Sequence, residues 1–87
     1  MKINYEFVKR NIANEDFLVP VGEGAKKFKG LFALTEVAAF IWDLLPEMNS
    51  DEKIVAKILE EYEVSPEEAA TDTAEFLSKL REMGIID

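Results

Sequence analysis

Carboxylates are the one reactive residue type that this sequence supplies in quantity. It has 18 Asp and Glu residues against 10 Lys and Arg, and it has no His and no Cys. Two carboxylates can perform acid–base chemistry when their surroundings shift one of the pKa values. Seven of them fall in or between two amphipathic segments, mostly on polar faces: Glu60, Glu61, Glu63, Glu67, Glu68, Asp72 and Glu75. This is the pattern of solvated helix surfaces, so we expect no acid–base pair among them.

Other catalytic and metal-binding arrangements are missing from the sequence. Without His or Cys, the chain lacks the usual zinc ligands and the usual base for a Ser or Cys nucleophile. Ser50 and Ser65 stand where helix caps are expected, and Ser78 has no nucleophile-elbow context. The glycine-rich segment 22–27 lacks the phosphate-loop pattern, and no loop has EF-hand form. We therefore predict a protein that is not an enzyme and binds no cofactor or metal.

The patterning of apolar residues predicts that strands come before helices. Residues 3–12 and 17–21 are separated by a polar turn at 13–16, which predicts a hairpin. Segment 22–27 has the composition of a flexible connector, and 28–34 that of a third strand. Within this third strand, Gly30 marks a bulge or a close backbone approach.

Three helices are predicted after the strands. The first, residues 35–45, is apolar nearly all round and must lie at the centre of a small core. Its Asp43 either faces an exposed edge or pairs with a Lys or Arg, and we favour the edge. The second helix begins near Asn49 or Ser50, with capping-box spacing from Asn49 to Glu52. The third is capped by Ser65 and ends at Gly84.

These elements predict one α+β domain over residues 1–87. A three-stranded antiparallel sheet occupies residues 1–34, and three helices occupy residues 35–87. The last two helices resemble a helix-turn-helix unit, so the whole domain is similar to a winged helix with the sheet placed first.

The charge distribution argues against nucleic-acid binding. Residues 1–34 carry a net charge of +2, whereas residues 35–87 carry −10. The third helix has five acidic residues against Lys79 and Arg81, so it would repel phosphates. The basic cluster in the wing, Lys26, Lys27 and Lys29, is the only feature that favours the alternative function, a winged-helix transcriptional regulator or nucleic-acid-binding protein.

The sequence has no signal peptide and no apolar run of membrane length, so we expect a cytoplasmic protein without membrane contact. An exposed strand edge could also pair with a second copy, which leaves a homodimer open.

Three stretches of the chain resemble the PqqD family, also called the RiPP recognition element. They are "FLVPVG", "GLFALTEVAAFIWDLL" and "IVAKILEEYEVSPEEAATDTAEFLSKLREMGII", and the resemblance extends from about Phe7 to Ile86. Most of the matching positions are core and capping residues. Thr73 stands where an aliphatic residue is common in the family.

The resemblance implies a peptide-binding adaptor, or peptide chaperone. Such a protein binds the leader of a ribosomally made precursor peptide and presents it to a radical SAM or other peptide-modifying enzyme, in the PQQ pathway or a related one. The implied binding mode is strand addition between the third strand and the third helix. The candidate peptide-binding residues are Gly30, Leu31, Phe32, Ala33, Asp72, Phe76, Lys79 and Met83. By strand parity, we expect Phe32 and Leu34 to face the core, and Leu31 and Ala33 to face the groove.

Overall fold

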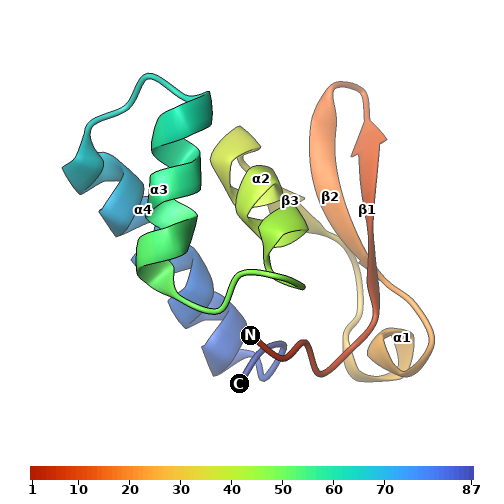
Figure 1. The fold of residues 1–87 in the computed structure, drawn as a ribbon. Coiled ribbons are helices and arrows are strands. Elements are labelled where there is room, and N and C mark those ends of the chain that lie inside the picture. Colours follow the sequence, from red (N-terminus) through yellow and green to blue (C-terminus); the bar gives the residue numbers. More distant parts are fainter.

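The computed structural model describes all residues from Met1 to Asp87. The elements follow in the order β1 (Phe7–Ile12), β2 (Glu15–Pro20), α1 (Glu23–Lys27), β3 (Phe32–Leu34), α2 (Glu36–Leu44), α3 (Asp51–Glu61) and α4 (Pro66–Glu82). The three strands form one antiparallel sheet in the order β1–β2–β3. Helices α2, α3 and α4 lie together on one side of this sheet (Figure 1). The α+β, winged-helix-like architecture predicted from the sequence is thus confirmed. No helix is both long enough and apolar enough to span a bilayer.

The hairpin turn fixes which backbone groups of the sheet bond to which neighbour. Ala13 and Asn14 form a two-residue connection with φ values of 52° and 67°, as a type I′ turn requires. In the same pairing, the Val21 N–H donates to the Glu6 carbonyl at 3.1 Å. Because bonding direction alternates along a strand, the odd-numbered residues of β2 bond to β1 and the even-numbered ones face β3.

The core is built around α2, as its apolar sequence predicts. Ile41 and Leu45 are completely buried, and Trp42 is nearly so. Ile54 and Ile58 of α3 and Leu77 of α4 belong to the same buried cluster, and their side chains are also fully enclosed. A helix that supplies core contacts on several sides holds the sheet and the other two helices at fixed separations.

An aromatic cluster joins the sheet to α2. The ring of Phe7 lies 5.7 Å from that of Trp42, 5.6 Å from Phe28 and 6.0 Å from Phe32, measured between centroids. Phe28 also meets Tyr5 edge-on at 5.2 Å. Such pairs stabilise beyond simple area burial, by about 0.5–1.5 kcal/mol each.

The outer face of the sheet is left uncovered by helices. Val8 lies opposite Val19, and Phe17 lies opposite both Arg10 and Ala33. None of these side chains packs against the main core cluster. The sheet is therefore covered on one face only.

The connector between β2 and β3 is not the flexible loop that its glycines predict. Residues 23–27 form the short helix α1, so one helix precedes residue 30. A side chain at Gly24 would bring its Cβ within 2.6 Å of the Glu6 carbonyl oxygen, so only glycine fits this crossing. At the far end, Phe28 is drawn into the aromatic cluster. These tertiary contacts organise a segment whose local composition predicts a flexible connector.

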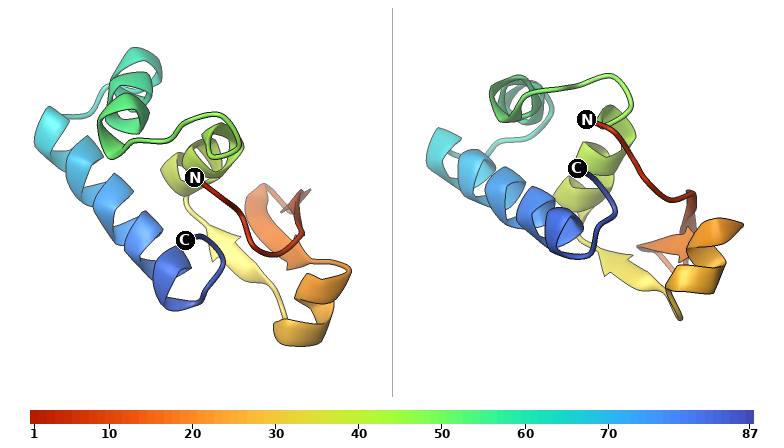
Figure 2. Two further views of the ribbon diagram at one scale, coloured as in Figure 1. Left: turned by 60° about the horizontal axis from the view of Figure 1, so that its bottom comes forward. Right: turned by 90° about the horizontal axis from the view of Figure 1, so that it is seen from below.

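The strand boundaries also differ from the prediction. Residues 3–6 do not belong to β1: Ile3 instead bridges to Ile86, and the Asn4 N–H donates to the Ile85 carbonyl at 2.7 Å. The two chain ends consequently lie close together (Figure 2). β2 spans 15–20 rather than 17–21. β3 begins only at Phe32, because Gly30 has a φ of 87° and turns the chain before the strand.

Helix caps follow the sequence closely. The side chains of Thr35 and Ser65 accept hydrogen bonds from the backbone three residues ahead, at 3.1 Å in both cases. Of the two predicted starts of α3, Ser50 is confirmed, because its side chain caps the helix in the same way; the capping box from Asn49 to Glu52 is wrong. Gly84 ends α4 in the left-handed region, and the Ile85 N–H donates to the Leu80 carbonyl at 2.9 Å.

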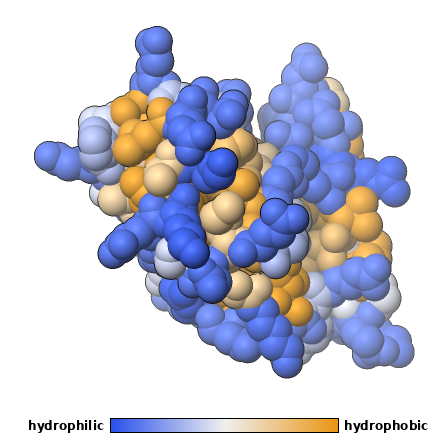
Figure 3. Space-filling view, viewed as in Figure 1, coloured by the Kyte–Doolittle hydropathy of each residue, from blue (hydrophilic) through white to orange (hydrophobic).

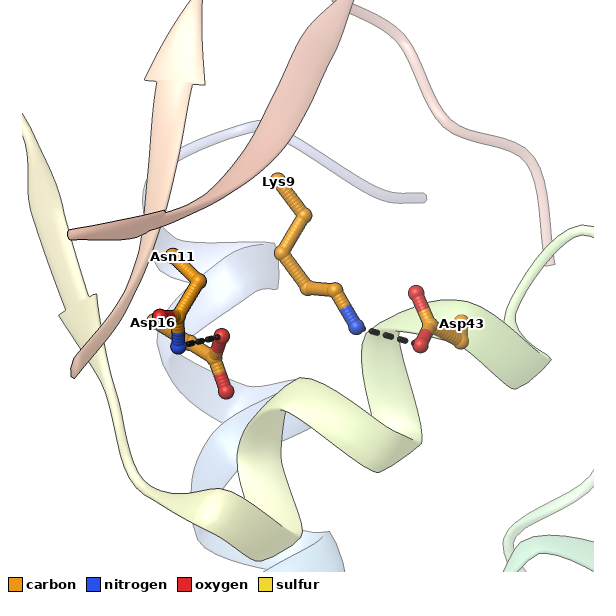
Figure 4. A network of polar contacts seen from close by, with 4 residues as sticks. All are labelled: Lys9, Asn11, Asp16 and Asp43. Carbon is orange, nitrogen blue, oxygen red and sulfur yellow. Dashed lines mark hydrogen bonds and ion pairs between the residues drawn. The ribbon is translucent and has the colours of Figure 1, made fainter. Parts of the chain in front are cut away.

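Asp43 both faces an exposed edge of α2 and pairs with a Lys, the two alternatives that the sequence left open. Its side chain is 55% exposed, yet it forms an ion pair with Lys9 of β1 (Figure 4). Nearby, the Asn11 side-chain amide donates to Asp16 at 3.1 Å across the hairpin. The ion pair joins the hairpin to α2. The face of the molecule seen in Figure 3 carries protruding hydrophilic side chains with hydrophobic patches between them.

Relieving the strain of the hairpin turn should stabilise the protein. Ala13 is an L-residue with a side chain at positive φ, which costs about 1–2 kcal/mol. Replacing Ala13→Asn together with Asn14→Gly should raise the free energy of unfolding by about 1 kcal/mol in urea titrations. Ala13→Val, which places a β-branched residue there, should lower it. Equal stability of all three proteins would contradict the assigned turn.

Removing a buried hydroxyl should also stabilise the protein. Thr73 on α4 is fully buried and its Oγ1 has no hydrogen-bond partner. Thr73→Val keeps the branched shape and should raise the free energy of unfolding by about 1 kcal/mol. Thr73→Ser keeps the hydroxyl and loses a methyl group, so it should lower stability by about 1 kcal/mol. A Val variant less stable than the wild type in chemical denaturation would show that the hydroxyl is satisfied.

Candidate functional site

A groove opens between the free edge of β3, the start of α2 and one face of α4. Its volume is about 510 Å³, and 11 of its 16 lining residues are hydrophobic. The lining residues are Leu18, Phe32, Ala33, Leu34, Thr35, Glu36, Val37, Ala38, Ile41, Asp72, Glu75, Phe76, Lys79, Leu80, Met83 and Ile85. A concave, mostly apolar surface with a few polar groups is the usual form of a ligand site.

The wall formed by β3 presents unpaired backbone groups. β3 has β2 on one side and no strand on the other. Phe32 and Leu34 pair with the even-numbered residues Leu18 and Asp16, so their N–H and C=O groups point toward β2. Ala33, between them, must point its N–H and C=O the opposite way, into the groove. This places one free donor and one free acceptor side by side at the sheet edge.

The wall formed by α4 is a single stripe of side chains. Asp72, Phe76, Lys79 and Met83 follow one another at spacings of four, three and four residues, which places them on one face of the helix. Leu80 lies beneath this stripe with 4% of its surface exposed. This face of α4 is therefore apolar at Phe76 and Met83 and charged at Asp72 and Lys79.

The structure brings six of the eight candidate residues to this groove. They are Phe32, Ala33, Asp72, Phe76, Lys79 and Met83. Gly30 and Leu31 are not in the lining, and Leu31 is 52% exposed before the strand begins. Phe32 and Leu34 pack against the core, as strand parity predicts, but they also border the groove. An edge strand contributes to such a groove sideways, so residues of both parities reach it.

The start of α2 is a part of the site that was not predicted from the sequence. Residues 35–38 line the groove together with Glu75. The Thr35 cap was the available signal: a helix that starts directly after β3 must place its first turn beside the edge of that strand.

The charges in the groove are not paired with one another. The ion pairs of the chain join Lys9 to Asp43, Lys26 to Glu23, and Lys57 to Glu60. The groove residues Glu36, Asp72, Glu75 and Lys79 take part in none of these pairs.

Glu36 also influences the pKa of Tyr62. Burial raises the pKa of Tyr62, and the negative charge of Glu36 raises it further. The Tyr62 ring packs edge-on against Phe40 of α2, with centroids 5.4 Å apart. Both influences favour the neutral form of the Tyr62 hydroxyl.

No group of three or more Asp or Glu side chains is gathered where it could hold a metal ion. The chemistry that the groove offers is backbone hydrogen bonding, apolar contact and charge attraction. A fold with an open strand edge beside a helix defines a winged-helix-like protein able to receive an extended segment of polypeptide.

Comparison with known proteins assigns the family. Residues 19–86 match the profile of the family described as Coenzyme PQQ synthesis protein D (PqqD), so the chain belongs to the PqqD family. No curated protein sequence matches the chain.

Two solved structures are similar over nearly the whole length. The structure of TbiB1 in complex with the TbiA(beta) leader peptide shares 31% identity at a TM-score of 0.71, covering 100% of this chain and 95% of that one. A lasso peptide synthetase B1 complexed with its leader peptide shares 23% identity at a TM-score of 0.69, covering 97% and 93%. The second likeness concerns the fold alone.

Proposed function

We propose that this chain acts as a single, non-catalytic peptide-binding module in the cytoplasm. It binds the leader of a ribosomally made precursor peptide and presents that peptide to a modifying enzyme, such as a radical SAM enzyme. The observation that carries the proposal is the free backbone edge at Ala33, which opens into an apolar groove. Membership of the PqqD family and the leader-peptide complex of TbiB1 support it.

The proposed binding mode adds the peptide to the sheet as a fourth strand. One peptide residue exchanges two backbone hydrogen bonds with Ala33, as in a narrow antiparallel pair. Its neighbours alternate in direction, so every second side chain turns toward α4 and rests on Phe76 or Met83. Backbone pairing supplies affinity for any extended segment, and the apolar contacts select among sequences.

The proposed function assigns presentation rather than chemistry to the adaptor. The leader is held at the edge of the sheet, while the rest of the precursor peptide extends beyond the groove. The modifying enzyme then acts on that extension, so the adaptor needs no reactive side chain.

A proline at the sheet edge should weaken peptide binding strongly without unfolding the sheet. Ala33→Pro removes the N–H that faces the groove, while the bonds of Phe32 and Leu34 to β2 remain. We expect the Kd to rise about tenfold or more for a peptide enriched on the wild-type protein from a random display library. Isothermal titration measures the change, and circular dichroism verifies the fold.

The matched control lies on the opposite edge of the sheet. By the same alternation, Asn11 of β1 points its N–H away from β2, so Asn11→Pro removes an edge donor far from the groove. This variant should bind the peptide as the wild type does. Unchanged binding by a folded Ala33→Pro protein, or equal losses in both variants, would contradict strand addition at β3.

A further inference from the structure

The acidic residues of the groove and its one basic residue are distributed unevenly along its length. Its acidic residues, Glu36, Asp72 and Glu75, belong to the start of α2 and the middle of α4. Lys79 lies one turn beyond Glu75 and two turns beyond Asp72 along α4, toward the end where Met83 and Ile85 line the groove. β3 and α4 run in roughly opposite directions (Figure 2). Phe32 is thus nearer the Lys79 end, and Glu36 is nearer the Asp72 end.

Lys79 is the only cation in the lining of the groove. Arg81, the other basic residue of α4, donates from its Nε to the Asp87 carbonyl at 3.1 Å and does not line the groove. The Lys79 ammonium and the Asp72 carboxylate are both left without an ion-pair partner. A bound peptide can therefore supply an opposite charge at each position, and such complementary pairs discriminate between sequences.

The spacing of the two charges sets the spacing of their partners. Asp72 and Lys79 are seven residues apart, which is about 10 Å along a helix. In an extended peptide, side chains on the same face recur every ~6.6 Å, so two of them that flank a third are about 13 Å apart. The length of the lysine side chain covers the difference. Phe76 lies between the two charges and faces the third, central side chain.

The backbone sets the orientation of the peptide. Both existing strand pairs are antiparallel, and the outward pair of groups on Ala33 suits an antiparallel partner that exchanges both bonds with one residue. A peptide antiparallel to β3 has its N-terminal end at the Glu36 and Asp72 side. Its C-terminal end then lies at the Lys79 side.

We infer that the groove selects extended peptides with a basic residue, an apolar residue two positions later and an acidic residue two positions after that. The basic side chain lies beside Asp72, the apolar one on Phe76 and the acidic one beside Lys79. This inference rests on the proposed function, because it describes the specificity of the same groove.

Selection from a random peptide library displayed on phage tests the charge order. Selection on the wild-type protein should enrich the basic-x-apolar-x-acidic pattern, read from N to C. A synthetic peptide with that pattern should bind about tenfold more tightly than the same peptide with its two charged residues exchanged. Fluorescence polarisation at low and high salt measures both, and the difference should shrink at high salt.

A charge-exchanged protein provides the reciprocal test. Asp72→Lys combined with Lys79→Asp keeps the net charge and the composition, and it should invert both the enriched pattern and the preference between the two peptides. The control exchanges another pair of charges: Lys57→Glu with Glu60→Lys on α3, which lies outside the groove lining and keeps its ion pair. That variant should retain the wild-type preference.

The outcomes separate this inference from the proposed function. Peptides that bind the wild type and lose binding on Ala33→Pro, but show no charge order or the reverse order, would overturn the inference and leave the proposed function standing. A selection that yields no peptide sensitive to Ala33→Pro would overturn both. A preference that does not invert in the charge-exchanged protein would also refute the inference.

Discussion

The open edge of the sheet depends on the direction of the backbone groups at Ala33, which point away from β2. This direction is determined at a distance, by the two-residue turn at Ala13–Asn14. That turn fixes which residues of β2 bond to β1, and the alternation along β2 then fixes which residues of β3 bond inward. A shift of one residue in either register would point the free groups of Phe32 and Leu34 into the groove and reverse every side chain of β3. The turn therefore maintains an unusual conformation at Ala13, because the register depends on it.

The groove stays open because α2 holds its walls apart. Its buried residues, Ile41 and Trp42, contact the core from the centre of the molecule, and its first turn continues directly from β3 through the Thr35 cap. On its other side, Asp43 is joined to Lys9 of the hairpin. α4 is held by its own buried face, so it cannot close onto the strand without losing core contacts. An edge strand that is neither paired nor covered is otherwise a liability for aggregation, and its charged surroundings limit that risk.

The sequence predicts the elements whose signals are local. The caps at Thr35 and Ser65, the stop at Gly84 and the apolar character of α2 all act within a few residues, and the structure confirms them. The stripe on α4 follows from helical spacing alone. Helix α1 could not be predicted, because Gly24 is fixed by a carbonyl from a distant part of the chain. Likewise, the contribution of the first turn of α2 to the groove depends on how three elements meet in space.

Amide hydrogen exchange at residues 32–34, followed by NMR, reports which backbone N–H groups of β3 are bonded and which are free. In the free protein, Phe32 and Leu34 are bonded to β2 and Ala33 is not, so the account predicts slow exchange at the two outer positions and fast exchange at Ala33 between them. On addition of a saturating peptide selected on the wild-type protein, Ala33 should become protected while its neighbours change little. A slowly exchanging Ala33 in the free protein, or an Ala33 that stays unprotected when the peptide is bound, would contradict the account.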